Sequence, residues 1–334
     1  MPDLSRTDAD SSSPLEHCGE DSGNLWGIVL VEHRSPKPPA VTPRFNGTDL
    51  FKHYCTEIGH RHWVQRTLDR VSSLTTPNER LVVTSRDRLE KDLEDVREPD
   101  VLLVQPYNRD SGPGVLLALL RIQGQDPDAT VAIFPSEHCA FIPDDEVFMA
   151  HVLQGIKFVT AYPDLLMLLG TVPDRPEMVH DWIEPGPVIA RQSGYRFLQV
   201  RGIREGRDRP MAKALYPEAG LWNSRIVLGR LSTLLQSSQK TLPELWERFQ
   251  RIEAALDNAQ MLEDVYRGMP VANFSRHVLQ KIPQGLGVVP VMSDCSPDWK
   301  KQERSKTLAE AKAGEAEEAL SQLQNRSRRW EGVV

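Results

Sequence analysis

The sequence lacks the features that mark several classes of protein. Its four cysteines, Cys18, Cys55, Cys139 and Cys295, lie far apart and form no Cys-x-x-Cys pair, which disfavours a disulfide framework or a structural zinc site. No apolar run is long enough for a transmembrane helix, and the acidic, polar start has no apolar segment of a signal peptide. We therefore expect a cytoplasmic protein with no membrane partner.

The sequence also lacks an excess of positive charge. The chain has 40 Lys and Arg against 47 Asp and Glu, which gives a formal net charge of −7. Binding of nucleic acid depends on clustered Lys and Arg, so we expect no nucleic-acid partner. The 334 residues, 40% hydrophobic and 26% charged, have the composition of an ordinary globular protein that can bury a large core.

Apolar runs alternate with helical patterns through the first half of the chain. Runs typical of buried parallel strands lie at residues 26–31, 80–84, 101–104 and 130–134. Helices are predicted at residues 62–74, 87–96 and 114–123, and a long loop at 32–55. This order is typical of an α/β fold with a doubly wound, Rossmann-like, mostly parallel sheet. Its ligand crevice is expected where the loops open at Glu32, Gln105 and Pro135.

The second half is less regular, and both ends look different from the middle. Strands are expected at residues 164–171, 197–201 and 286–292, and helices at 242–256 and 261–268. Residues 1–24 have too few apolar side chains to offset the entropy of ordering, so we expect a disordered tail. Residues 301–334 are rich in Ala, Glu, Lys and Gln, which predicts a charged helical or disordered tail.

Several short segments, taken in order, resemble the motifs of one enzyme family. They are Lys52-His-Tyr-Cys55, Gln105-Pro-Tyr-Asn-Arg-Asp-Ser-Gly-Pro-Gly114, Phe134-Pro-Ser-Glu-His138, Trp182-Ile-Glu-Pro-Gly186, Gly220-Leu-Trp-Asn-Ser224, Asn273-Phe-Ser-Arg276 and Ser293-Asp294. The pattern is similar to that of sugar-1-phosphate nucleotidyltransferases of the mannose-1-phosphate guanylyltransferase type. The resemblance covers residues 25–300 and implies a glycosyltransferase-A-like domain, with a nucleotide-binding half at 25–160 and a sugar-binding half at 161–300.

The resemblance also implies a reaction and a set of site residues. A sugar-1-phosphate would attack the α-phosphorus of a nucleoside triphosphate, and pyrophosphate would leave. Lys52 matches the family's phosphate-binding lysine, although alone it could be a solvated lysine. Gln105, Arg109 and Asp110 match positions that contact the nucleotide, although the same loop could simply cap the next helix.

Other matched positions concern the metal and the sugar. Glu137 and Asp294 fall where the family holds Mg²⁺ with carboxylates, Glu137 being one methylene longer than the family's aspartate. The sugar would be held by Glu184, Glu205 and Asn223. The family's lysine after Glu205 is Gly206 here, although Arg207 or Arg209 could supply a positive charge. For Trp222 we favour packing within the protein over stacking on a ligand.

The loop after the first strand departs most from the family. Glu32, His33 and Ser35 replace its glycines, whose backbone N–H groups would cradle phosphates. Two like charges about 4 Å apart repel by about 4 kcal/mol at an effective dielectric near ~20, so Glu32 opposes triphosphate binding. We expect weak or absent catalysis. Two hypotheses stay open: a working enzyme that uses GTP, mannose-1-phosphate and Mg²⁺, and an inactive relative that acts as a regulatory or binding partner. The sequence leaves the oligomeric state open.

Overall fold

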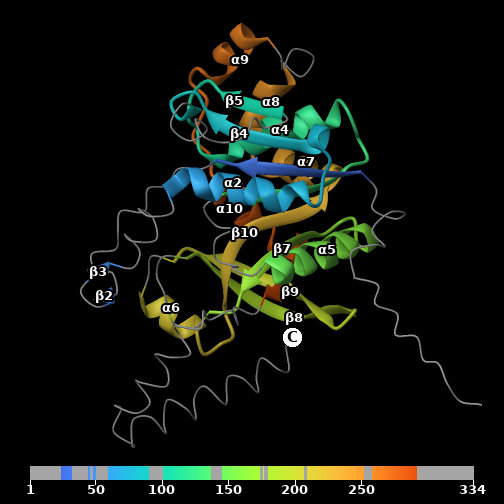
Figure 1. Cartoon of the computed structure of the whole chain (residues 1–334), viewed down its shortest axis with the longest axis vertical. Helices are drawn as coiled ribbons and strands as arrows, with labels where there is room; N and C mark the ends of the chain where they lie inside the picture. Colours follow the sequence, from blue (N-terminus) through green and yellow to red (C-terminus); the bar gives the residue numbers. More distant parts are fainter. Residues whose placement is uncertain are drawn as a thin grey trace, which may run out of the picture.

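The structure is a computed structural model. It describes residues 24–31, 44–45, 48–49, 59–89, 101–136, 145–173, 176, 180–206, 209–251 and 258–291. A nine-stranded sheet with the order β5-β4-β1-β6-β10-β7-β11-β9-β8 forms its centre (Figure 1). The strands of this sheet are β1 (Leu25–Leu30), β4 (Arg80–Ser85), β5 (Val101–Gln105), β6 (Thr130–Pro135), β7 (Leu166–Thr171), β8 (Trp182–Gln192), β9 (Tyr195–Arg204), β10 (Leu221–Arg230) and β11 (Leu286–Val291).

The sheet is mixed. Strands β5, β4, β1 and β6 are parallel neighbours, and β7 is parallel to β11. Strand β10 runs antiparallel between β6 and β7, and β9 pairs antiparallel with both β11 and β8. The predicted α/β class is therefore confirmed, whereas the expected predominance of parallel pairing holds from β5 to β6 and, beyond β6, only for the pair of β7 and β11.

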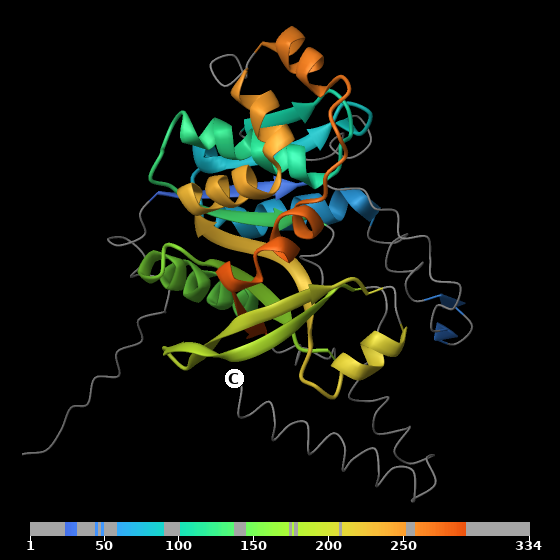
Figure 2. The same ribbon diagram turned by 180° about the vertical axis from the view of Figure 1, so that it is seen from behind.

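Helices cover both faces of the sheet, as Figures 1 and 2 show from opposite sides. On one face, α2 and α5 share a core with the strands; on the other, α4, α7, α8 and α10 share a second core. The helices are α2 (Gly59–Ser72), α4 (Ser111–Gln123), α5 (Asp145–Ala161), α6 (Arg209–Leu215), α7 (Leu231–Thr241), α8 (Pro243–Gln250), α9 (Ala259–Tyr266) and α10 (Phe274–His277), with short 3-10 turns η1 (Pro77–Glu79), η4 (Leu279–Lys281) and η5 (Pro283–Gly285).

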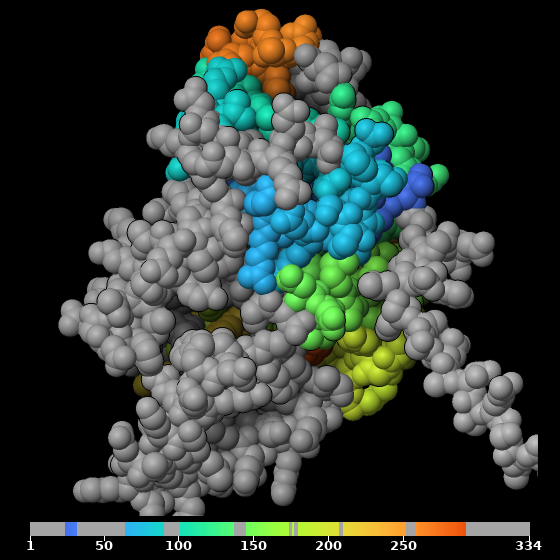
Figure 3. Space-filling model, in the orientation of Figure 1, coloured from blue at the N-terminus to red at the C-terminus, as the bar shows by residue number. Residues whose placement is uncertain are grey.

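Strand β1 shows why the middle of the sheet is apolar throughout. All its residues are buried, with Trp26 and Ile28 facing one core and Leu25 and Val29 the other. A strand covered on both faces needs apolar side chains at every position. On the α2 side, Figure 3 shows α2 (blue) and α5 (green) side by side at the surface. Both Arg66 and the buried Arg70 of α2 pair with the carboxylate of Asp145, which begins α5.

Most predicted elements are confirmed to within a few residues. The expected strands correspond to β1, β4, β5, β6, β7, β9 and β11, and the expected helices to α2, α4, α8 and α9. One prediction was partly wrong, because the loop expected at 32–55 contains a small antiparallel pair, β2 (Arg44–Phe45) with β3 (Thr48–Asp49). The predicted tails at 1–24 and 301–334 and most of the helix expected at 87–96 lie outside the described residues.

The two strands that the sequence did not suggest, β8 and β10, have local irregularities. Strand β8 contains Pro185 and Pro187, which usually argue against a strand; it tolerates them through register shifts along its pairing with β9 at one edge of the sheet. Strand β10 carries an irregularity between Asn223 and Val227 that interrupts its apolar run. Helix α5 does have a readable pattern, because Phe148, Val152, Ile156 and Val159 recur at helical spacing and are buried.

None of the helices in the described part of the chain combines the length and the apolarity needed to cross a membrane.

Candidate functional site

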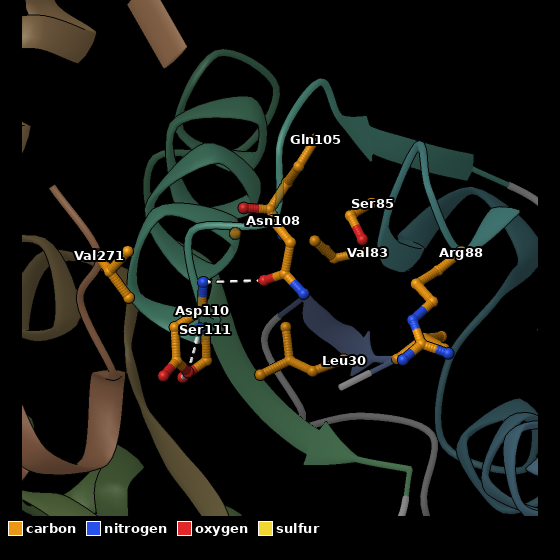
Figure 4. Close-up of a pocket in the computed structure, with 11 residues that line it drawn as sticks. Leu30, Val83, Ser85, Arg88, Gln105, Asn108, Asp110, Ser111 and Val271 are labelled. Atoms are coloured by element: carbon orange, nitrogen blue, oxygen red, sulfur yellow. Dashed lines mark hydrogen bonds between the residues drawn. The ribbon is translucent and has the colours of Figure 1, made fainter. Parts of the chain in front are cut away.

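A cleft of about 240 Å³ opens where the carboxyl ends of β1, β4 and β5 face the start of α4 (Figure 4). Parallel strands end at the same edge of a sheet, which is where α/β folds bind ligands. Gln105 lines this cleft as expected, whereas Pro135 does not, and Glu32 lies outside the described residues. The lining residues are Leu30, Val31, Val83, Ser85, Arg88, Gln105, Asn108, Asp110, Ser111, Gly114 and Val271.

The side chain of Gln105 is held in a fixed position. Its Oε1 accepts a hydrogen bond of 3.3 Å from the hydroxyl of Tyr266, and burial raises the pKa of that hydroxyl, which keeps it protonated as a donor. A Cβ atom at position 114 would lie 2.8 Å from Nε2 of Gln105, so Gly114 leaves the room that this side chain needs. With Oε1 engaged, the amide nitrogen of Gln105 is the group left for a ligand.

Asp110 caps helix α4. Its Oδ1 accepts hydrogen bonds from the backbone N–H of Ser111 at 2.7 Å and from Nδ2 of Asn273 at 2.9 Å. Its backbone (φ 67°, ψ −173°) lies in a region that mainly glycine adopts and that costs a residue with a side chain about 1–3 kcal/mol. Asp110 lines the cleft, but the observed contacts favour the capping role that the sequence left open.

The first N–H groups of α4 have partners within the protein. Asp110 takes the N–H of Ser111, and the N–H of Gly112 donates to the carbonyl of Ala272 at 2.7 Å. Pro113 has no N–H. The N-terminus of a helix binds phosphate through free backbone N–H groups. The beginning of α4 therefore has fewer donors for an anion than an uncapped helix would have.

Arg109 does not line the cleft. Its Nη2 donates to the backbone carbonyl of Tyr266 at 3.4 Å, and its guanidinium lies 5.7 Å from the ring centre of Tyr107. The carbonyl of Arg109 accepts a hydrogen bond from the N–H of Ala272. These contacts tie the loop before α4 to the segment between α9 and α10. The expected contact of Arg109 with a nucleotide stays a prediction, because Arg109 is not among the residues that line the cleft.

Sequence reasoning missed the polar residues Ser85, Arg88 and Asn108 of the cleft. Ser85 ends β4, and Arg88 lies in the turn that follows. The backbone N–H of Arg88 donates to the carbonyl of Ser85 at 2.9 Å. Asn108 lies in the loop after β5, and its Oδ1 accepts a hydrogen bond from the N–H of Asp110. A signal was available, because residues that follow a strand next to the first strand are expected at the same sheet edge.

The residues expected to hold the sugar already have partners in the protein. Oε1 of Glu184 accepts from Nε of Arg204 at 2.7 Å across the β8–β9 hairpin. Oε1 of Glu205 lies 2.6 Å from Nε of Arg276. None of the expected sugar-side residues lines the cleft described above, so the nucleotide and sugar residues form separate groups.

Asn223 is buried, with 2% of its surface exposed. Its Oδ1 accepts from the N–H of Arg225 at 2.8 Å, and its Nδ2 lies 3.5 Å from the hydroxyl of Ser275. Arg225 has a positive φ of 59°, a conformation that favours glycine, and its guanidinium pairs with Asp181 at 2.7 Å. Asn223 therefore stabilises the irregular backbone of β10 in addition to any contact with a sugar.

These polar residues form a connected group, which we call the β10 junction: Asp181, Glu205, Asn223, Arg225, Ser275 and Arg276. Asp181 joins its parts, because it pairs with Arg225 and its Oδ1 accepts from the N–H of Gly206 at 3.3 Å. Helix α10 links the β10 junction to the cleft. Asn273, just before the helix, donates to Asp110, and Ser275 and Arg276 contact the junction.

The structure does not place the remaining predicted site residues. Lys52, Glu137 and Asp294 lie outside the described residues. Among the residues that are described, no group of three or more His, Cys, Asp or Glu side chains could hold a metal ion.

Comparisons with known proteins bear on the expected family. No protein-family model matches the chain. The "Xanthan biosynthesis protein XanB" of Xanthomonas campestris pv. campestris (strain B100) is 23% identical over 198 residues, which cover 58% of this chain and 40% of that protein. The "Alginate biosynthesis protein AlgA" of Pseudomonas fluorescens is 23% identical over 256 residues, which cover 73% of this chain and 51% of that protein. The chain thus spans about half the length of these relatives or less.

Solved structures share the fold. One described as a mannose-1-phosphate geranyltransferase from Thermus thermophilus superposes with a TM-score of 0.59 at 21% identity, covering 81% of this chain and 75% of that one. One described as a mannose-6-phosphate isomerase from Helicobacter pylori superposes with a TM-score of 0.56 at 17% identity, covering 80% of this chain and 97% of that one. The resemblance predicted from the motifs is confirmed to this extent: the chain is similar in sequence to the XanB and AlgA proteins and shares its fold with the mannose-1-phosphate geranyltransferase and mannose-6-phosphate isomerase structures.

Proposed function

We propose that the chain binds a nucleoside triphosphate, GTP, in the cleft and a sugar-1-phosphate, mannose-1-phosphate, at the β10 junction. One observation supports this proposal most strongly: α10 and Asn273, which caps it, contact both places. Asn273 bonds Asp110 of the cleft, and Arg276 pairs with Glu205 of the junction. At about 1.5 Å of rise per residue, three helical positions separate these contacts by about 5 Å along the axis, so ligands in the two places would be neighbours.

The reaction that these ligands allow is nucleotidyl transfer. A phosphate oxygen of the sugar-1-phosphate would form a bond to the α-phosphorus, the bond from that phosphorus to the bridging oxygen would break, and pyrophosphate would leave with the electron pair. The protein contributes positioning and charge to such a step. In this proposal residues 25–160 serve the nucleotide and 161–300 the sugar, in the cytoplasm.

Several residues outside the described part belong to the proposal. We assign to Lys52 the role of a point charge on the triphosphate, and to Glu137 and Asp294 the carboxylate oxygens for Mg²⁺, an ion that prefers such ligands. When bound, Mg²⁺ neutralises charge on the phosphates. In the described part, Gln105 would contact the nucleotide through its amide, and Glu184 would share its carboxylate between Arg204 and a sugar hydroxyl.

Turnover is expected to be weak. The sequence replaces the loop glycines by Glu32, His33 and Ser35, and the N–H groups of Ser111 and Gly112 already have protein partners. The first feature hinders the close approach of the loop backbone to the phosphates, and the second leaves fewer free N–H donors to stabilise their negative charge. The same observations favour a second candidate function, a relative that binds its ligands without turnover and regulates a partner.

The test combines turnover and binding. Purified protein is mixed with GTP, Mg²⁺ and mannose-1-phosphate, and pyrophosphate release is measured; a slow release that needs the sugar phosphate is the expected result. Thermal unfolding is followed in parallel, because a ligand at ~100 times its dissociation constant adds about 2.7 kcal/mol of stability. Stabilisation by GTP without pyrophosphate release would support the binding-only candidate. Absence of both would refute the proposed function.

A further inference from the structure

Arg88 and Arg86 leave the same turn after β4 in different directions. The guanidinium of Arg86 pairs with Glu263 at 2.8 Å, and its side chain is 59% exposed. Arg88 lines the cleft, and Figure 4 shows its guanidinium directed toward Leu30, across from Asp110 and Val271. The two residues therefore carry the same charge from the same turn, one to the outer surface and one to the cleft.

The guanidinium of Arg88 makes no hydrogen bond or ion pair with the residues that the structure describes. Among the described lining residues, the only carboxylate is that of Asp110, whose Oδ1 is occupied by Ser111 and Asn273. A half-buried guanidinium loses part of its hydration, and it regains that free energy when an acceptor binds. The fixed fork of an arginine fits a ligand that presents two acceptors side by side.

The neighbouring amides add donors to the same cleft. Oδ1 of Asn108 accepts from the N–H of Asp110 at 3.0 Å, which leaves Nδ2 of Asn108 as a donor. Oε1 of Gln105 accepts from Tyr266, which leaves Nε2 of Gln105 as a donor. The walls between these groups are apolar, from Leu30 and Val83. The cleft thus suits a flat ring with several acceptors on its edge.

We propose that Arg88 selects the base of the nucleotide by donating to two adjacent acceptors on the ring. This inference rests on the proposed function. Guanine presents O6 and N7 side by side as acceptors, whereas adenine presents an amino donor beside N7. A guanidinium fork matches the first edge and meets a donor on the second. Arg88 is therefore a specificity-determining residue that no motif of the sequence indicated.

The experiment measures the dissociation constants of GTP and ATP, each with Mg²⁺, by titration calorimetry on the full chain. The variants are Arg88→Gln, which removes the charge, and Arg88→Lys, which keeps the charge and removes the fork. For Arg88→Gln we expect the ratio of the ATP to the GTP dissociation constant to fall about tenfold or more, as for the loss of a bidentate contact to guanine. For Arg88→Lys we expect a smaller fall, because an ammonium group can still donate to O6 and N7 but lacks the planar fork. Arg86→Gln is the matched control and should leave the ratio unchanged.

Each other outcome contradicts the inference in a distinct way. If Arg88→Gln weakens GTP and ATP equally and Arg88→Lys restores both, the residue holds phosphate and does not read the base. If neither variant changes the ratio, Arg88 has no part in recognition. If the unaltered protein binds neither nucleotide while it keeps a cooperative unfolding transition, the proposed function fails first and this inference fails with it.

Discussion

The cleft and the β10 junction handle their polar groups in opposite ways. In the cleft, the side chains of Arg88, Asn108 and Gln105 have N–H groups that donate to no described residue. The walls between these side chains are apolar. In the β10 junction, positive and negative side chains already pair, as Asp181 does with Arg225 and Glu205 with Arg276. The difference teaches that the cleft is ready to receive a ligand, whereas a ligand at the junction has to compete with bonds inside the protein.

The largest expected effect tests whether the junction is structural. Asp181→Ala leaves the guanidinium of Arg225 without its partner, and both side chains are mostly buried, with exposed fractions of 12% and 15%. Loss of one member of a buried pair costs about 3 kcal/mol, which urea unfolding can measure.

A second change checks the cause of that loss. Arg225→Gly, added to Asp181→Ala, removes the unpaired charge and suits the positive φ of 59° at this position, so most of the lost stability should return. If the double variant is no more stable than Asp181→Ala, the pair does not account for the effect.

A smaller loss of stability is expected from a change at the start of α4, which borders the cleft. Gly112→Ala places a Cβ atom 2.6 Å from the carbonyl oxygen of Ala272, a backbone atom that cannot turn aside. Overpacking of this kind costs about 2 kcal/mol, and the shift of α4 should also weaken GTP binding.

Gly124→Ala at the other end of α4 is the matched control. Its nearest atoms lie at 3.8 Å and 3.9 Å, and its φ is −70°, so its stability should change by at most about 0.5 kcal/mol. Equal unfolding midpoints for both glycine variants would show that the close contact between Gly112 and Ala272 does not constrain the start of α4 beside the cleft.

The smallest effect on stability is expected at the exposed pair of Glu184 and Arg204, whose side chains are 25% and 58% exposed. Glu184→Gln should change the free energy of unfolding by less than about 1 kcal/mol, because surface pairs contribute little. If Glu184 also holds a sugar hydroxyl, the KM for mannose-1-phosphate should rise and the KM for GTP should not. Glu244→Gln in α8, which belongs to the exposed pair with Arg248, is the control that should change neither.

The local pattern of apolar residues predicted the strands that contain a continuous apolar run. The apolar runs of β1, β4 and β6 follow from burial on both faces, and the motif from Gln105 to Gly114 correctly marked the loop at the mouth of the sheet. Strand β8 was missed because its prolines are tolerated only at a sheet edge. The role of Arg88 was missed because the spacing of charges along the turn after β4 does not reveal which side faces the cleft.

The sequence by itself determined the α/β class, the order of most strands along the chain and the resemblance of the motifs, because these depend on local spacing and residue type. Only the tertiary structure decided that Asn223 stabilises the irregular backbone of β10 and that Asp110 caps α4. The same holds for the bond of Asp110 to Asn273, by which α10 links the cleft to the β10 junction. The bond between Asn273 and Asp110 spans 163 positions of the chain. Such a contact depends on the order of strands in the sheet, which local periodicity does not encode.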